Sequence, residues 1–393
     1  MNFLRTGLLT LAVLVSTAGA AHAQSVCDPD GVQASGSIYR ICMPTSGYNG
    51  MLVIWAHGFQ DAGTEVSIPE DQLCVSGFCL PELINGLGFA FATNSYSKTG
   101  LAVLQGMDDI RDLVDIFTAE KGAPERVYLI GASEGGIITT LLAEQHPDEF
   151  DAGVAACGPI GSFRYQMDYF GDARVTFEVF WPGLIPGDPL HPSQDLIDMW
   201  PDYYENVVKP AVLADPARLW QWATVARLPF DPDNYDETIE ESVNAALRYA
   251  VLNFNDVVET IGGFPFGNMR RWYEGSANDE WLNEHVTRVK ADLGTLVEMR
   301  QNYDTTGQLD VPLVTIHTTK DQQVPFRHEK LYAGKTYQSG DFNVLHETFW
   351  YERYGHCNFT SDEALAAFFE MLSLAGDFAQ ARTVNEYRSA RNR

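Results

Sequence analysis

The stretch VYLIGASEGG, residues 127–136, decides the fold. Its first residues are apolar and β-prone, and they run into a Gly-x-Ser-x-Gly turn that is followed by an apolar helical pattern. A serine at such a sharp turn holds a strained backbone, so the residues two before and two after it must be small, as Gly131 and Gly135 are. The helix start offers free N–H groups and a dipole that favours negative charge. The pattern therefore predicts that Ser133 is a nucleophile.

A serine hydroxyl is a weak nucleophile at neutral pH and needs a base within hydrogen-bond reach. The order serine, acid, histidine is typical of this strand–turn–helix arrangement, so the base should lie near the C-terminus. His346 lies inside the last predicted strand, 344–351, and His328 opens a predicted helix. His356 lies in a turn just past that strand, from which an imidazole can reach over the serine. We therefore predict that His356 is the base.

A third group must hold the base in the correct tautomer. The acid is expected directly after the preceding strand, 311–316, and Asp321 stands at that place. Asp304 and Asp310 are less well placed, because both precede the strand. The alternative for Asp321 is an ordinary surface aspartate. We predict that Asp321 orients the base.

Acyl transfer also needs donors for the oxyanion of the tetrahedral intermediate. One donor should be the backbone N–H of Glu134, directly after the nucleophile. The other should be the backbone N–H of Phe59, in the His57-Gly58-Phe59 turn after the first long strand. His57 could act as a second base, but a shaping role suits its place in the turn better. The side chain of Glu134 either forms a hydrogen bond beneath the cap or faces solvent.

Apolar, β-prone runs alternate with stretches of helical spacing from residue 51 onward. One helix is predicted around 107–117 and a second over 137–143. This alternation predicts an α/β fold with a doubly wound, mostly parallel sheet. The predicted strands are 51–56, 89–93, 127–130, 152–156, 311–316 and 344–351, after an antiparallel start at 38–42.

The alternation stops after Cys157 and resumes at residue 311. Unstructured loops longer than about 15 residues are uncommon, so this stretch is predicted to be a helical cap inserted after the sixth strand. The predicted domains are a signal peptide (1–23), a core in two parts (24–158 and 311–393) and the cap (159–310). Six tryptophans lie in the cap and form either an aromatic roof over the substrate or the cap's own core.

The first 23 residues have the pattern of a secretory signal, with Arg5, an apolar run over 8–15 and Ala-His-Ala at 21–23. The run is shorter than the roughly 20 residues of a membrane-spanning helix, so we expect a secreted or periplasmic protein with no membrane attachment after cleavage. An uncleaved anchor is the alternative. The net charge of −27, from 26 basic and 53 acidic residues, argues against nucleic acid or an anionic membrane as partner.

Six cysteines in an exported chain allow three disulfides. Cys27 and Cys42 flank the first predicted hairpin, and Cys74 and Cys79 could close a short loop. We expect structural roles for both pairs. No spacing of cysteines and histidines resembles a zinc site.

These elements together resemble the α/β-hydrolase superfamily over residues 51–157 and 311–378. Within it, the chain is similar to exported bacterial esterases and to prolyl-oligopeptidase-like serine hydrolases. The pair His356-Cys357 is also similar to tannases and feruloyl esterases, in which a cysteine beside the catalytic histidine is bridged to one beside the serine. This chain departs from that pattern, because Ala132 precedes Ser133.

We expect Cys357 to pair instead with Cys157, which follows the strand next to the nucleophile's strand and could reach the histidine loop. Such a bridge would fix the base. The alternative is two free, buried thiols.

The expected activity is hydrolysis of a carboxylic ester through an acyl-enzyme, with a small-molecule or polymeric substrate and no metal or organic cofactor. Esters are favoured because amide cleavage demands more protonation of the leaving group. A serine peptidase for short peptides is the main alternative. A non-catalytic binding protein with this fold is a further one. The sequence leaves the acyl and alcohol groups and the oligomeric state open.

Overall fold

The structure is a computed structural model that describes residues 25–75, 78–340 and 344–391. The predicted signal peptide lies outside the described residues. Among the helices that the structure describes, none is long and apolar enough to cross a membrane.

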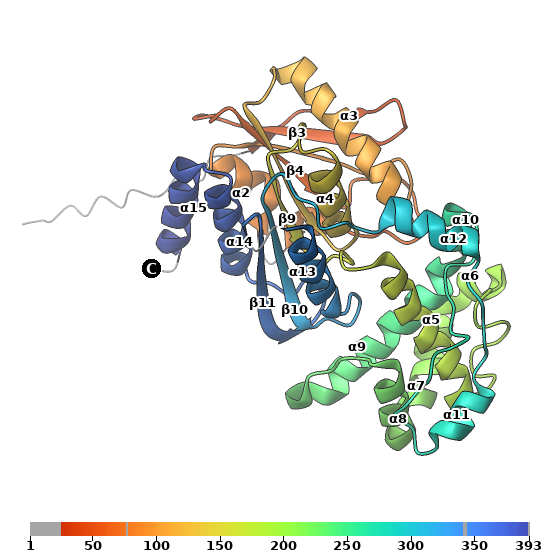
Figure 1. The fold of residues 1–393 in the computed structure, drawn as a ribbon. Helices are drawn as coiled ribbons and strands as arrows, with labels where there is room; N and C mark the ends of the chain where they lie inside the picture. Colours follow the sequence, from red (N-terminus) through yellow and green to blue (C-terminus); the bar gives the residue numbers. More distant parts are fainter. Residues whose placement is uncertain (1–24, 76–77, 341–343, 392–393) are drawn as a thin grey trace, which may run out of the picture.

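A nine-stranded mixed sheet forms the centre of the protein (Figure 1). Neighbouring strands are parallel from β7 through β4, β8, β9 and β10 to β11. At the other end of the sheet, β3 pairs antiparallel with β7, and β1 and β2 each pair antiparallel with β3. Strand β9 stands sixth along the sheet. The order is β1 (Ser25–Cys27), β3 (Ile38–Pro44), β7 (Ala90–Asn94), β4 (Met51–Ala56), β8 (Arg126–Ala132), β9 (Ala152–Ala156), β10 (Leu313–Lys320) and β11 (His346–Tyr354), with β2 (Gly31–Val32) off this path.

Helices cover both faces of this sheet, as a doubly wound fold requires. One face packs against α3 (Val103–Lys121), α4 (Glu134–Gln145) and Tyr332 of α13 (Arg327–Ser339). The other face packs against α2 (Leu80–Gly86), α14 (Ser361–Leu374) and α15 (Phe378–Arg391). A small antiparallel pair, β5 (Cys74–Val75) and β6 (Phe78–Cys79), follows α1 (Glu70–Leu73). The predicted fold class is confirmed.

The predicted strands 51–56 and 152–156 match β4 and β9. The two C-terminal strands run further than predicted. Strand β10 continues to Lys320, because its ladder with β11 extends to the pair Lys320 and Tyr354. Polar residues Thr318 to Lys320 end the apolar pattern before the hydrogen bonds end, so composition alone placed the boundary too early.

Only helices fill the chain between β9 and β10, and Figure 1 shows them gathered to one side of the sheet. They leave the sheet after β9 and return at β10, its parallel neighbour. The helices are α5 (Phe163–Phe180), α6 (Gln194–Tyr203), η1 (Tyr204–Val208), α7 (Lys209–Leu213), α8 (Pro216–Ala226), η2 (Pro232–Asn234), α9 (Tyr235–Arg248), η3 (Tyr249–Asn253), α10 (Phe254–Ile261), α11 (Asp279–His285), α12 (Leu293–Glu298) and η4 (Met299–Tyr303).

Candidate active site

Ser133 stands at the turn between β8 and α4 with φ 57° and ψ −118°. This left-handed backbone is strained for a residue with a side chain, and such strain is often found at functional sites. A Cβ on Gly131 would lie 2.2 Å from the carbonyl oxygen of Gly135, and one on Gly135 would lie 1.9 Å from that of Ala56. Both glycines are therefore required by close backbone approach, as the sequence predicts.

Asp321 and His356 are hydrogen-bonded. Asp321 follows β10 directly and His356 follows β11, and these strands are parallel neighbours. His356 Nδ1 lies 2.7 Å from Asp321 Oδ2. The other carboxylate oxygen accepts the N–H groups of Gln323 and Val324 at 2.8 and 2.9 Å. Burial opposes ionisation of Asp321, but the charge of His356 and the hydrogen bonds from both imidazoles outweigh it and hold the pKa of Asp321 well below its usual range.

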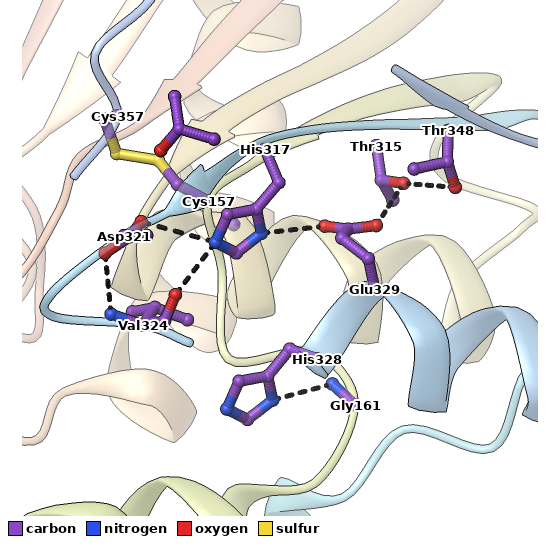
Figure 2. A network of polar contacts seen from close by, with 12 residues as sticks. Cys157, Gly161, Thr315, His317, Asp321, Val324, His328, Glu329, Thr348 and Cys357 are labelled. Atoms are coloured by element: carbon purple, nitrogen blue, oxygen red, sulfur yellow. Dashed lines mark hydrogen bonds and ion pairs between the residues drawn. A yellow bond between two sulfur atoms is a disulfide. The ribbon is translucent and has the colours of Figure 1, made fainter. Parts of the chain in front are cut away.

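A disulfide ties the His356 loop to the end of β9, the strand next to the one that carries Ser133. The Ser133 N–H donates to the carbonyl oxygen of Ala156 at 2.8 Å, and the next residue, Cys157, is bonded to Cys357 with the Cα atoms 5.5 Å apart (Figure 2). Cys357 Sγ lies 3.6 Å from His356 Nε2. The structure has no hydrogen bond between Ser133 Oγ and His356, and such bonds are often long until substrate binds.

The predicted oxyanion donors lie beside Ser133. Glu134 is the first residue of α4, so its N–H has no helical carbonyl to bind. Phe59 follows Gly58, whose N–H donates to Gln72 Oε1 at 2.7 Å. Phe59, Ser133 and Glu134 all line one pocket.

His57 is buried and does not line that pocket. Its Nδ1 contacts the carbonyl oxygen of Gly58 at 2.7 Å, and its ring stacks on Tyr96 at 3.9 Å. Burial lowers the pKa of His57 to about 4, although backbone hydrogen bonds oppose this. This arrangement favours the shaping role over the role of a second base.

Residues 85–178, which contain the Ser133 turn, match the model of the prolyl oligopeptidase family. Together with the sheet order and the strained serine turn, this match decides the fold family. By its fold, the chain is an α/β-hydrolase.

A curated relative of the hydrolase is a poly(3-hydroxyalkanoate) depolymerase C from Paucimonas lemoignei, 29% identical over 199 residues. The alignment covers 48% of the hydrolase and 40% of the relative, so the chain spans less than half the length of the relative it matches.

Solved structures with some likeness include an esterase from Pyrococcus furiosus, 12% identical with a TM-score of 0.44 over 89% of each chain. Another is an acylaminoacyl peptidase from Pyrococcus horikoshii, 11% identical with a TM-score of 0.41 over 85% of the hydrolase and 38% of that chain.

The pocket beside Ser133 is apolar and has an empty volume of about 650 Å³, part of it open to solvent. Five aromatic residues line it: Phe59, Phe163, Phe170, Tyr249 and Phe254. None of the six tryptophans between β9 and β10 does. Trp181, Trp200 and Trp222 are buried within the helical segment, so they belong to its own core, whereas the other three are largely exposed.

Sequence reasoning missed these pocket residues. A signal was present, because Phe163, Met167 and Phe170 recur at helical spacing and occupy one face of α5. That spacing indicates an apolar face but not whether the face covers a core or a pocket.

The Glu134 side chain is buried, not solvent-facing. Its Oε1 accepts the N–H of Ala102, before α3, at 2.9 Å. Burial raises the pKa of Glu134 to about 8, although the Ala102 hydrogen bond and the charge of Lys98 oppose the shift. At neutral pH, the carboxyl of Glu134, a residue that lines the pocket, is therefore largely protonated.

All three predicted cysteine pairings are confirmed: Cys27–Cys42, Cys74–Cys79 and Cys157–Cys357. The third pair is unusual in its backbone, because Cys157 and Cys357 adopt φ values of 46° and 49°. The turns that carry this disulfide and the turn that carries Ser133 thus share a left-handed conformation.

Proposed function

We propose that this hydrolase cleaves carboxylic esters through an acyl-enzyme formed on Ser133. The observation that carries the proposal is the His356–Asp321 hydrogen bond of 2.7 Å on a loop that Cys357 ties to the end of β9, the strand next to that of Ser133. A histidine held in this way has Nε2 free to accept the serine proton.

In the first step His356 Nε2 takes the proton of Ser133 Oγ while the oxygen attacks the ester carbonyl carbon. The backbone N–H groups of Glu134 and Phe59 bind the oxyanion of the tetrahedral intermediate. His356 then gives its proton to the departing alcohol oxygen. Water, deprotonated by His356, attacks the acyl-enzyme, and the acid is released with Ser133 restored.

The pocket supports an ester with an apolar acyl or alcohol group. Its walls are mainly aromatic and aliphatic, and the Glu134 carboxyl is largely neutral at pH 7. A peptide with a free ammonium group would find no full negative charge there. The name of the depolymerase relative supports an ester bond as the target, in a small or polymeric substrate.

A peptidase for short peptides is the second candidate, because the matched family model is that of prolyl oligopeptidases. For location, we propose export to the periplasm or medium after removal of residues 1–23. The three disulfides support an oxidising compartment. We also propose that residues 159–310 form a cap domain over the site, with the core in 24–158 and 311–393.

The test uses purified protein, a fluorophosphonate probe and two substrate sets, aryl esters and aminoacyl anilides. The wild type should react with the probe and turn over esters, and Ser133→Ala should do neither. Ser67→Ala, at an exposed loop serine, is the matched control and should behave as wild type. Comparable turnover of anilides would favour the peptidase, and no labelling of the folded wild type would favour a non-catalytic protein.

A further inference from the structure

A second buried histidine, His317, contacts the same carboxylate as His356. His317 stands in β10, four residues before Asp321, and its side chain has no exposed surface. Its Nε2 lies 3.3 Å from Asp321 Oδ2 and 2.9 Å from the carbonyl oxygen of Val324. Figure 2 shows the ring between Asp321 and Glu329 of α13. The proposed reaction gives His317 no step of its own.

Both ring nitrogens of His317 face acceptors. A carbonyl oxygen can only accept, so Nε2 carries a hydrogen. Nδ1 lies 3.0 Å from Glu329 Oε1, and the second oxygen of that carboxylate accepts the Thr315 hydroxyl at 2.6 Å. This geometry is that of an imidazolium between two carboxylates. Burial alone lowers the pKa of His317, but its hydrogen bonds to Asp321 and Glu329 raise it to about 10.

The other titratable groups packed around Asp321 stay uncharged. Burial lowers the pKa of His328 on α13 well below its usual value. Burial also raises the pKa values of Tyr169 on α5 and Tyr354 on β11 above theirs. The charges that face His356 across this cluster are therefore those of Asp321, His317 and Glu329.

We propose that His317 and Glu329 form a positioning pair for the His356–Asp321 couple. The proposal rests on the ester-hydrolase mechanism given above. His317 holds Asp321 Oδ2 in place and shares its negative charge with His356, so the carboxylate keeps the position from which it orients His356. Glu329 supplies the opposite charge that lets the His317 cation stay buried. When His356 takes the serine proton, two cationic rings face two carboxylates and the cluster becomes neutral.

The test follows kcat and KM for an aryl ester against pH in the full chain. His317→Gln removes the cation and leaves two carboxylates near His356. The acid limb, which is the fall of kcat/KM on the acidic side of the pH profile, should therefore shift to higher pH by about one unit. Its kcat should fall while KM changes little, since no substrate contact is lost. His317→Gln/Glu329→Gln removes one charge of each sign, so the limb should return toward its wild-type position.

His328→Gln is the matched control, because it replaces a buried histidine of α13 that bonds Gly161 and Gln166 and carries no charge. Its acid limb should stay at the wild-type position. An unmoved limb in His317→Gln would overturn the positioning role.

A second measurement does not depend on turnover. Nitrogen-15 spectra of histidine-labelled wild type should show one ring protonated at both nitrogens from pH 5 to 9. That signal should disappear in Glu329→Gln, which releases the proton, and this assigns it even where His317→Gln does not fold. A His317 ring with one bare nitrogen at pH 7 would overturn the proposal. A wild type that neither turns over esters nor reacts with fluorophosphonate would instead refute the proposed function.

Discussion

Asp321 is surrounded by donors on every side. Two backbone N–H groups bind Oδ1, and the imidazoles of His317 and His356 share Oδ2. Removing any one donor leaves the carboxylate held by the others. The charge of Asp321, in contrast, has no substitute, because it alone faces the imidazole of His356 directly.

We expect Asp321→Asn to lower kcat for an aryl ester by about 10³- to 10⁴-fold, because a neutral amide does not hold His356 in the correct tautomer or stabilise its cation. Steady-state kinetics at the pH optimum measures the loss. Asp310→Asn, at the exposed aspartate before β10, is the control and should stay within about twofold of wild type. Equal losses in both variants would contradict the assignment of Asp321.

Glu134 should make stability depend on pH. Its folded pKa of about 8 lies above that of an unfolded glutamate, about 4.3. Between these pH values the folded chain binds the proton and the unfolded chain does not, so the free energy of unfolding falls as the pH rises. Glu134→Gln keeps an acceptor for the Ala102 N–H without the charge. It should be more stable than wild type by about 5 kcal/mol at pH 9 and equal to it near pH 4.

Chemical denaturation at pH 4, 7 and 9 measures this difference. Glu65→Gln, at an exposed glutamate, should leave the pH dependence unchanged. A stability gain in Glu134→Gln that is the same at all three pH values would mean that ionisation is not its cause.

At the scale of elements, the turn between β8 and α4 has no room for a Cβ at Gly131 or at Gly135. We expect Gly131→Ala and Gly135→Ala to abolish fluorophosphonate labelling of Ser133, because the added carbon collides with backbone oxygens that cannot move aside. Gly294→Ala, at an exposed position of α12, is the control, since nothing lies within 4 Å of its added Cβ. That variant should label normally and gain about 0.5–1 kcal/mol. Normal labelling of Gly135→Ala would show that the turn is not needed.

The elements were predictable where one face or both faces of an element are apolar. The strands β4 and β9 are buried at all but one position each, so their runs of apolar residues mark both ends. The ends of β10 and β11 were missed because polar residues continue the ladder there. The proposed site residues Ser133, Asp321 and His356 could be picked out because each follows a recognisable strand.

The rest of the site depends on long-range packing that no local pattern reveals. Glu329 lies on a helix and His317 inside a strand, and only their folded positions create the buried pair. The burial of the Glu134 side chain likewise depends on the approach of Ala102 from the start of α3. Charged residues of this kind are normally exposed, so composition favours the wrong environment for them.

At the scale of the whole molecule, the Cys157–Cys357 bridge closes a loop of 200 residues that includes the helical segment. We expect Cys157→Ala/Cys357→Ala to lose about 4 kcal/mol of stability and to react with fluorophosphonate at least tenfold more slowly, since the His356 loop is no longer tethered. Cys27→Ala/Cys42→Ala removes a bridge at the far edge of the sheet and should lose stability without slowing the reaction. Equal labelling rates in the two variants would refute the tether.

The helical segment is bonded to the sheet domain at separate places. Arg248 pairs with Asp61, Lys98 Nζ lies 3.1 Å from Asp256 Oδ1, and the Tyr354 hydroxyl donates to the carbonyl oxygen of Thr238 at 2.7 Å. Arg248 and Thr238 lie at the two ends of α9, and Asp256 lies on α10. The contacts therefore hold α9 and the pocket-lining helix α10 against the sheet domain.

The segment leaves and re-enters the sheet at two parallel strands that lie next to each other. The number of residues in the segment therefore does not affect the distances between Ser133, Asp321 and His356, because all three follow strands of the sheet itself. Evolution or an engineer can replace these helices with another set, or lengthen them, while the reacting groups keep their spacing. Such an exchange would replace the pocket residues Phe163, Phe170, Tyr249 and Phe254 but would leave Phe59 and the reacting groups as they are.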